Sequence, residues 1–486
     1  MSTEKGAEPA PARVKPQEVK PGISYADYVE DFRRAGHEAV EWIASYLEHT
    51  REYPVLPRIK PGDLIDALPG SAPDKGESFD AILEDFEQKI VPAVTHWNHP
   101  RFLAYFACTG STPAIVAEMF SAALNTNGLH WLTSPAVAEL EKVALGWLRQ
   151  WLGLPDDYFG IIYDTASVSS MHAIAAAREM AAPEFRENGS SPDLVLYTSQ
   201  ESHSSIEKGA IAIGVGQKNV RKIPTDTEFR MSPQALSEAI QQDIAAGRKP
   251  FCVVATVGTT SSTSVDPVAA IADIAQQHKL WVHIDAAYGG AAAVLPECRW
   301  ILNGVERAHS LVMNPHKWLF TPVDLSAFYT RRPDILRRAF SLVPEYLTPH
   351  EDTRAINLMD YGVPLGRRFR SLKLWFLMRY FGRDAIQQLL RNHIQWAKEF
   401  ADQIDAHPSF ERAAPVNFSV VCFRLRGDDA RNRELLERIN ATGQVFLSGT
   451  SLNGQYVLRI AIGNLATTRE DVQYAWQLVQ KMAAEL

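Results

Sequence analysis

The sequence predicts an α/β protein with a mostly parallel sheet, a helical layer before it and a small α+β domain after it. Two observations predict this fold. Through the middle of the chain, short apolar runs alternate with stretches of helical periodicity, which is typical of a parallel sheet covered on both faces. Toward the C-terminus, helices mix instead with two apolar strands, Phe418–Leu425 and Tyr456–Ile462. A chain of 486 residues is also too long for one simple core.

The N-terminal part of the chain has little to bury at first and then becomes periodic. Residues 1–22 carry four prolines among charged residues, so we expect a flexible tail. From Tyr25 to about Thr50, and again near Phe79–Ile90, apolar residues recur at helical spacing, which predicts two amphipathic helices. The predicted domains are the tail, a helical segment over 23–111, a large α/β domain over 112–374 and a small α+β domain over 375–486.

The large domain opens with a helix at Ser134-Pro135, because serine caps a helix and proline suits its first turn. Strands and helices then alternate. The predicted strands are Leu194–Tyr197, Phe251–Thr256, Leu280–Asp285, Ser310–Met313 and Leu325–Tyr329. The predicted helices are Ser167–Met180, Ser232–Ala246 and Pro267–His278, with a further helical stretch at Arg370–Tyr380.

Composition argues against several kinds of partner. The net charge of −8 gives no general attraction for nucleic acid or an anionic membrane. No apolar run approaches the roughly 20 residues that span a bilayer, and the N-terminus lacks an apolar signal-peptide core. The four cysteines show no metal-ligand spacing, and Cys252 and Cys422 lie in apolar runs. We therefore expect no nucleic-acid, membrane or metal partner, and buried free thiols in a reducing cytoplasm.

The first candidate for chemistry is Lys317, in the sequence S-L-V-M-N-P-H-K-W-L-F from Ser310 to Phe320. Pro315 stops an apolar strand, so the lysine stands at a strand end among apolar residues. A desolvated lysine loses its charge more easily, and a neutral amine can attack an aldehyde to form a Schiff base. The alternative is a lysine that snorkels from an apolar patch, which these residues alone favour.

A second stretch favours the chemical interpretation. W-V-H-I-D-A-A-Y-G-G, from Trp281 to Gly290, is typical of a buried strand that ends in Asp285 and is followed by small residues. A carboxylate there, with room for a flat ring, suits the pyridinium nitrogen of pyridoxal 5'-phosphate (PLP). A helix-capping aspartate is the alternative. Because Asp285 and Lys317 each close an apolar strand, the pair indicates a PLP site.

Five motifs carry a family resemblance. They are N-P-H-K-W at 314–318, H-I-D-A-A-Y at 283–288, Y-T-S-Q-E-S-H-S-S at 197–205, V-A-T-V-G-T-T at 254–260 and P-L-G-R-R-F-R-S-L-K at 364–373. Along the chain these motifs occur in the same order as in a known family. From about Tyr25 onward, the chain resembles the PLP-dependent group II decarboxylases, and specifically the aromatic L-amino-acid decarboxylases. The resemblance implies PLP fold type I (aspartate aminotransferase-like). It also implies a homodimer, packed through the helices of 23–111, with active sites at the subunit interface.

The resemblance also implies cofactor contacts. His203 would stack on the pyridine ring, and Thr260 would form a hydrogen bond near it. Asp285 would keep the ring nitrogen protonated, and Ala287 is a further implied cofactor contact. For the phosphate, the implied contacts are Ala166 and Ser167 at a helix N-terminus, together with Asn314 and His316. For the lone histidine and the hydroxyls, ordinary structural roles are the alternative. One departure stands out: Asp164 occupies a position where the family has glycine or another small residue, so we expect its carboxylate to point away from the phosphate.

The implied catalytic residues are Lys317, His203, Asp285 and Tyr346. Residues 341–362 are polar and weakly periodic, as suits a mobile loop over the site. Tyr346 matches the loop tyrosine whose phenolic proton directs true decarboxylases toward an amine product. Aldehyde-forming relatives resemble a version with phenylalanine there, so an aromatic aldehyde synthase is the alternative reaction. A PLP-binding regulatory protein without catalysis is the alternative of another class.

The implied substrate is an aromatic L-amino acid: tryptophan, phenylalanine, tyrosine or DOPA. Cys108 stands where animal DOPA decarboxylases have threonine, which removes a hydroxyl near the catechol. Leu129 and Val323 replace phenylalanines, which predicts a roomier pocket, and Gly366 matches relatives that take indoles. The remaining residues of the implied side-chain pocket are Trp97, Tyr105 and Phe106.

Overall fold

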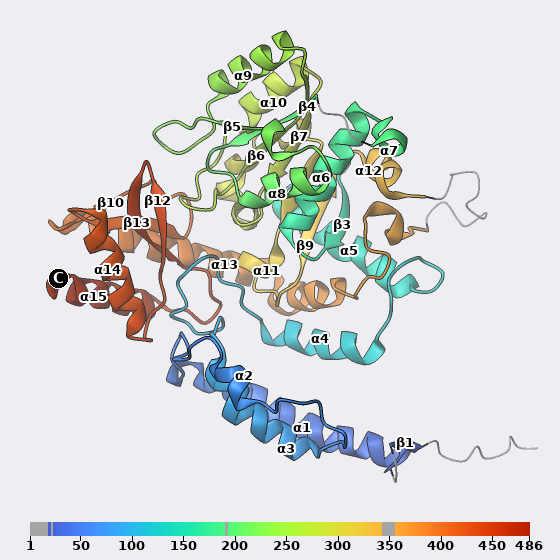
Figure 1. The fold of residues 1–486 in the computed structure, drawn as a ribbon, viewed down its shortest axis with the longest axis vertical. Helices are drawn as coiled ribbons and strands as arrows, with labels where there is room; N and C mark the ends of the chain where they lie inside the picture. The colour runs from blue at the N-terminus through green and yellow to red at the C-terminus, as the bar shows by residue number, and fades with distance from the viewer. Residues whose placement is uncertain (1–17, 21–22, 190–192, 343–354) are drawn as a thin grey trace, which may run out of the picture. The chain divides into compact units, whose positions relative to one another are not determined.

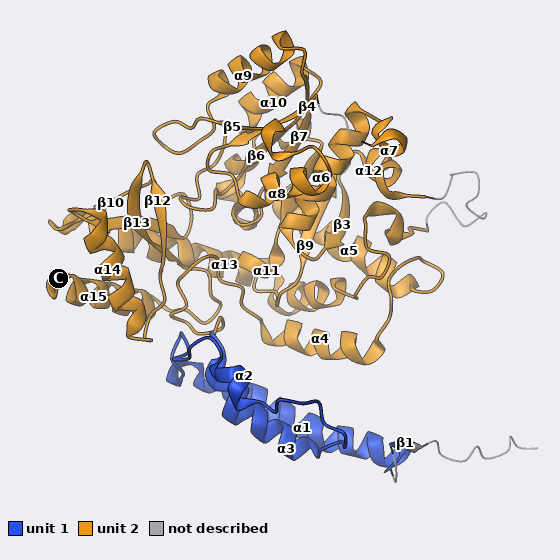
Figure 2. Ribbon diagram, in the orientation of Figure 1, with its two compact units in different colours: residues 1–95 blue, residues 96–486 orange. Residues whose placement is uncertain are grey.

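The computed structural model describes residues 18–20, 23–189, 193–342 and 355–486 (Figure 1). The chain forms two compact units, residues 1–95 and 96–486 (Figure 2). This division is coarser than the predicted one, and the predicted boundaries at 111 and 374 stay predictions. Helix α13, Ser371–Ala406, runs across position 374, so no linker marks that boundary.

The first unit contains the two predicted amphipathic helices. Helix α1, Tyr25–His49, begins at a capping box in which Ser24 accepts from the backbone N–H of Asp27 at 3.2 Å. Helix α3, Phe79–Asp85, continues into a helical turn at Phe86–Ile90, and Trp42 of α1 packs its ring 4.9 Å from that of Phe86. A short helix α2, Asp63–Ala67, lies between them in sequence. Strand β1, Glu18–Lys20, pairs with β2, Ile23–Ser24, so this part of the predicted tail is a strand.

The second unit is built on a seven-stranded sheet. In spatial order its strands are β3 (Phe159–Tyr163), β9 (Ser326–Thr330), β8 (Ser310–Met313), β7 (Trp281–Asp285), β6 (Lys249–Thr256), β4 (Leu194–Ser199) and β5 (Val220–Ile223). Only β9 runs antiparallel to its neighbours. All five predicted strands of this domain are present. β3 and β5 were not predicted, and β5 (V-R-K-I) lacks the continuous apolar run that identified the others.

Helices cover both faces of this sheet (Figure 1). Because side chains alternate along a strand, neighbouring residues enter different cores: Ile161 packs in one hydrophobic cluster and Ile162 in the other. The face of Ile161 is covered by α6 (Ala166–Ala181), α8 (Ser204–Ala212) and α12 (Pro333–Phe340). The face of Ile162 is covered by α5 (Pro135–Leu152), α9 (Pro233–Ala245) and α10 (Val268–Gln277).

The C-terminal part is a four-stranded antiparallel sheet backed by helices. Its order is β10 (Phe410–Arg412), β11 (Val420–Leu425), β13 (Gln455–Ala461) and β12 (Ser448–Leu452). Two of these strands were predicted, and β10 and β12 were not. Helix α13 breaks at Gly382, whose φ of 65° lies in the left-handed region that glycine adopts without strain. The other helices of the unit are α4 (Thr112–Leu124), α7 (Phe185–Asn188), α11 (Pro315–Trp318), α14 (Asp429–Ala441) and α15 (Arg469–Ala484).

Two features of the described residues bear on the expected partners. No helix among them is both long enough and apolar enough to cross a bilayer. No group of three or more histidine, cysteine or acidic side chains among them is arranged to hold a metal ion. All four cysteines are free thiols, and Cys252 and Cys422 are buried.

Candidate active site

The carboxyl ends of three adjacent parallel strands meet at one edge of the large sheet. Thr256, the last residue of β6, pairs with Asp285, the last residue of β7, and Asp285 pairs with Val312 of β8. A cavity of about 240 Å³ opens at this edge, where parallel sheets bind ligands. All nine predicted cofactor contacts line it: Ala166, Ser167, His203, Thr260, Asp285, Ala287, Asn314, His316 and Lys317.

Lys317 reaches the cavity from the short helix α11, which starts at Pro315 directly after β8. Burial lowers the pKa of its ammonium group; the charge of Arg459 adds to this shift, while Asp285 and Cys108 oppose it. The amine is therefore deprotonated more readily than an exposed lysine, as the apolar residues around it predicted. Its Nζ lies 5.1 Å from the centroid of the Phe106 ring.

Asp285 lies on the floor of the cavity with only 4% of its surface exposed. One carboxylate oxygen accepts from the backbone N–H of Ala287 at 3.1 Å. Small residues keep the adjoining backbone close: a Cβ on Gly289 would lie 2.5 Å from the carbonyl oxygen of Val257. A buried acid beside small residues fits the ring nitrogen of a flat cofactor.

Asn314 and His316 lie at another part of the cavity wall. His316 Nδ1 accepts from the Leu325 N–H at 2.9 Å, so the neutral ring carries its proton on Nε2. Burial lowers the pKa of His316 to about 3, which keeps the ring neutral. Asn314 is 2% exposed, and its side-chain oxygen has no hydrogen-bond partner among the described residues. The N–H groups at the start of α6, whose first residues Ala166 and Ser167 line the cavity, are donors that fit a bound group carrying a phosphate.

His203 precedes α8 and is exposed at the cavity. Its Nδ1 accepts from the Ser205 backbone N–H at 3.2 Å and contacts the Ser205 hydroxyl at 2.8 Å. In the neutral ring the proton therefore lies on Nε2. Partial desolvation lowers the pKa of His203; Asp285 opposes this shift and Lys317 adds to it. A neutral imidazole in this position can lie against a ring and donate one hydrogen bond.

Of the seven predicted substrate residues, only Phe106 lines this cavity in the single chain. Trp97 and Tyr105 are stacked on one another close by, with centroids 6.1 Å apart. The Cys108 thiol contacts the carbonyl oxygen of Phe106 at 3.6 Å. The remaining three, Leu129, Val323 and Gly366, do not line the cavity. Tyr346 lies outside the described residues.

Sequence reasoning missed Arg459, which comes from β13 of the C-terminal sheet. It is 3% exposed, and its Cζ lies 4.6 Å from the Phe106 centroid. Its Nε donates to the Ser261 carbonyl at 3.0 Å and its Nη1 to the Tyr105 carbonyl. Its Nη2 has no hydrogen-bond partner among the described residues. The signal was a lone charge inside the apolar run V-L-R-I-A-I, which an inward-facing cation explains.

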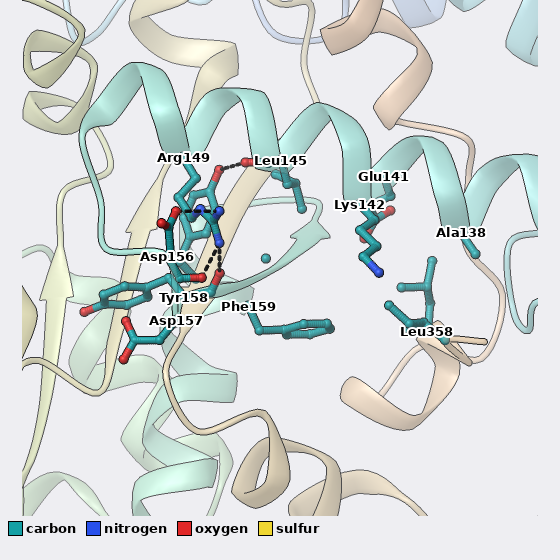
Figure 3. Close-up of a pocket in the computed structure, with 14 residues that line it drawn as sticks. Ala138, Glu141, Lys142, Leu145, Arg149, Asp156, Asp157, Tyr158, Phe159 and Leu358 are labelled. Carbon is teal, nitrogen blue, oxygen red and sulfur yellow. Dashed lines mark hydrogen bonds and ion pairs between the residues drawn. The ribbon is translucent and has the colours of Figure 1, made fainter. Parts of the chain in front are cut away.

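A second cavity, of about 390 Å³, lies between α5, β3 and the residues near Leu358 (Figure 3). Most of its charged side chains already have ionic partners. Arg149 bonds Asp156 at 2.9 Å, and Glu141 accepts from Arg367 at 2.7 Å. None of the predicted catalytic, cofactor or substrate residues lines it. The cavity at the strand ends is therefore the candidate active site.

Comparisons with known proteins agree with this geometry. Residues 61–426 match the pyridoxal-dependent decarboxylase conserved domain. The chain is 40% identical to phenylacetaldehyde synthase of Arabidopsis thaliana, over 94% of this chain and 96% of that one. It is also 40% identical to a tryptophan decarboxylase of Camptotheca acuminata, over 94% and 95%. The solved structure of Catharanthus roseus tryptophan decarboxylase with L-tryptophan superposes with a TM-score of 0.91 at 37% identity, covering 97% of this chain and 100% of that one. These matches confirm the predicted fold class, fold type I.

Proposed function

The chain belongs to the pyridoxal-dependent decarboxylase family, and from that premise we propose that it converts aromatic L-amino acids to arylalkylamines and CO2. It is a carboxy-lyase whose cofactor is PLP. The observation that carries the proposal is the presence of Lys317, Asp285 and His203 in one cavity at the strand ends. Neither the cavity beside α5 nor the one lined by Lys279 and His309 combines a lysine with a buried acid and a histidine.

Each of these residues has a task that its surroundings suit. The Lys317 amine, whose pKa burial lowers, is the nucleophile that would hold the cofactor aldehyde. The buried Asp285 would keep a proton on the ring nitrogen, and His203 would lie against the ring. Bound there, PLP supplies the electron sink into which the electrons of the breaking Cα–carboxylate bond flow. Because the bond that breaks is the one held perpendicular to the ring, the protein's part is mainly orientation.

Two features support an aromatic amino acid as the substrate. Phe106 and Tyr288 give the cavity an aromatic wall. The guanidinium of Arg459 lies over Phe106 of the cavity wall, and its Nη2 has no hydrogen-bond partner among the described residues, so we propose that it donates to the α-carboxylate of the substrate. Two plant tryptophan decarboxylases are among the relatives: that of Camptotheca acuminata shares about two fifths of the sequence, and that of Catharanthus roseus shares the fold. We extend their substrate class to this chain as part of the proposal.

We also propose a homodimer with active sites at the subunit interface. Helix α1 buries only Ala35, while Tyr25 and Phe32 are 60% and 69% exposed. A second copy would cover this apolar face. It would also account for Leu129, Val323 and Gly366, which do not line the cavity of their own chain and would line the partner's. Light scattering on the purified protein should give twice the chain mass. For location we propose the cytoplasm, where Cys252 and Cys422 would stay reduced.

One assay tests the reaction. The purified protein is incubated with PLP and each of tryptophan, phenylalanine, tyrosine and DOPA, and amine, aldehyde, ammonia, peroxide and CO2 are all measured. We expect equal amounts of amine and CO2, and no turnover by Lys317→Ala. Borohydride should fix the cofactor on Lys317 of the wild type, and cofactor fixed on another lysine would overturn the assignment. A protein that binds PLP but turns over none of the four would instead favour a regulatory role.

The second candidate is an aromatic aldehyde synthase, favoured by the 40% identity to phenylacetaldehyde synthase. Equal release of aldehyde, CO2, ammonia and peroxide would identify it. Tyr346, which matches the loop tyrosine of amine-forming relatives, argues for the amine.

A further inference from the structure

Asp164 lies between strand β3 and helix α6, directly before the residues predicted to hold the cofactor phosphate. One of its carboxylate oxygens accepts from the backbone N–H of Thr165 at 2.6 Å and from the Thr165 hydroxyl at 3.3 Å. Thr165 lines the active-site cavity together with Ala166 and Ser167. The carboxylate is thus an anion that the chain itself supplies at the N-terminus of α6.

The start of a helix favours negative charge, because its first N–H groups are unpaired and the helix dipole is positive there. A phosphate and a carboxylate use the same donors and the same dipole. The Thr165 N–H that bonds Asp164 is no longer available to a phosphate. The negative charge of Asp164 also repels a second anion placed beside it.

The nearby cation Arg370 does not remove this charge. Its guanidinium donates to both oxygens of Asp324, at 2.9 and 3.0 Å. Burial lowers the pKa of Arg370, but Asp324, and after it Asp164, raise the pKa by more. Asp164 is therefore within electrostatic reach of Arg370, whose charge Asp324 already compensates. The carboxylate of Asp164 does not itself line the cavity, but it is left as an additional negative charge next to Thr165, which does.

We propose that Asp164 weakens the hold of this cavity on the phosphate of PLP, so that the loaded fraction of the enzyme follows the concentration of free cofactor. This inference rests on the proposed function, since the phosphate in question is that of PLP. Two physical effects contribute, the loss of one N–H donor and the repulsion between like charges. Together they should weaken PLP binding about tenfold relative to a chain with a small neutral residue at this position.

Equilibrium binding to the full-length apoprotein tests the proposal without any measurement of turnover. PLP and pyridoxal, which lacks the phosphate, are titrated into the wild type, Asp164→Asn and Asp164→Gly, and the cofactor absorbance is followed. Asparagine keeps the shape and the acceptor for Thr165 but removes the charge, whereas glycine removes both. Asp157→Asn is the matched control, because Asp157 pairs with Arg331 at 2.6 Å, is half-exposed and does not line the cavity.

We expect PLP to bind Asp164→Asn several-fold tighter than the wild type, and Asp164→Gly about tenfold tighter. Pyridoxal affinity should stay unchanged in every variant, and the Asp157→Asn control should match the wild type with both ligands. Circular dichroism of the near-isosteric Asp164→Asn shows whether the comparison is between folded proteins. PLP affinity that stays the same in both Asp164 variants, or pyridoxal affinity that rises in step with it, would overturn the role of Asp164. A wild type that forms no complex with PLP at all would instead overturn the proposed function.

Discussion

The Lys317 amine and the Arg459 guanidinium face the same aromatic ring, with Nζ 5.1 Å and Cζ 4.6 Å from the centroid of Phe106. Phe106 is itself stacked on Tyr288, with centroids 3.9 Å apart and planes 20° from parallel. An aromatic face attracts cations through its quadrupole. Phe106 therefore helps to fix the guanidinium of Arg459 and, while its amine is protonated, the side chain of Lys317, in addition to forming a wall for the substrate.

Replacing this ring tests that role. Phe106→Leu keeps an apolar side chain but removes the aromatic face, and it should lower kcat several-fold, in keeping with the roughly 0.5–2 kcal/mol of a cation–π contact. Phe106→Tyr keeps the face and should stay close to the wild type. Steady-state kinetics give kcat and KM, and the pH dependence of the cofactor absorbance reports on Lys317. Identical values for the leucine and tyrosine variants would show that the aromatic face is not needed.

Asp285→Ala should retain some cofactor but lose most of the turnover. Without the carboxylate the ring nitrogen loses its proton, and the electron sink weakens. Removing one preorganised electrostatic partner of a reaction costs on the order of a hundredfold in rate or more. Absorbance titration measures the cofactor, and product release measures the rate. Near-normal turnover would mean that the ring nitrogen has another partner.

Tyr346→Phe should change the product and not merely the rate. The phenolic proton is expected to return to Cα after CO2 has left. Without this donor, dissolved oxygen would compete with protonation of Cα, so that aldehyde, ammonia and peroxide would replace part of the amine. The shift should shrink under anaerobic conditions. Amine formed at the wild-type rate with no aldehyde would exclude Tyr346 as the donor.

The buried pair of Glu141 and Arg367 gives a stability prediction. Glu141 is 2% exposed and accepts from Arg367 at 2.7 Å and from the Ile162 N–H at 2.8 Å. Glu141→Leu leaves the arginine buried without its partner and should lower the free energy of unfolding by about 3–5 kcal/mol. The control is Glu297→Gln, which breaks the exposed pair with Arg391 and should cost less than about 1 kcal/mol. Denaturant unfolding of both variants makes the comparison.

Buried histidines predict a loss of stability in acid. Burial lowers the pKa of His283 from 6.5 to about 4, and both ring nitrogens contact serine hydroxyls, at 2.9 and 3.1 Å. Below pH 6.5 His283 takes up a proton in the unfolded chain, whereas in the folded chain it stays neutral until about pH 4. The free energy of unfolding therefore falls as the pH drops through this window. The thermal midpoint should fall as the pH drops through it. His283→Gln should reduce the dependence of the thermal midpoint on pH. If that dependence is unchanged in the variant, it arises from other groups.

Residues close together in sequence explain what could be predicted of the fold and the site. Asp285 ends the apolar strand β7, and Lys317 lies in the short helix that directly follows the apolar strand β8, so local sequence was enough to predict the strands and to single out both residues. The antiparallel direction of β9 could not be predicted from the sequence, because an apolar run has the same pattern in either direction. Arg459 was missed for a different reason. Its approach to Phe106 depends on how the C-terminal sheet packs, and no local pattern encodes that contact.

Arg459 belongs to β13, so the ribosome adds it after all the residues that line the cofactor cavity. Synthesis of the cofactor contacts therefore precedes synthesis of the proposed contact to the substrate carboxylate. A ribosome completes every residue that lines the cofactor cavity by Lys317, well before it reaches the strand that carries the second cation. A nascent chain therefore contains its full set of cofactor contacts long before it contains the proposed partner of the substrate carboxylate. In this respect, the stretch of chain between Lys317 and Arg459 separates, during synthesis, the completion of the cofactor contacts from competence for the amino acid.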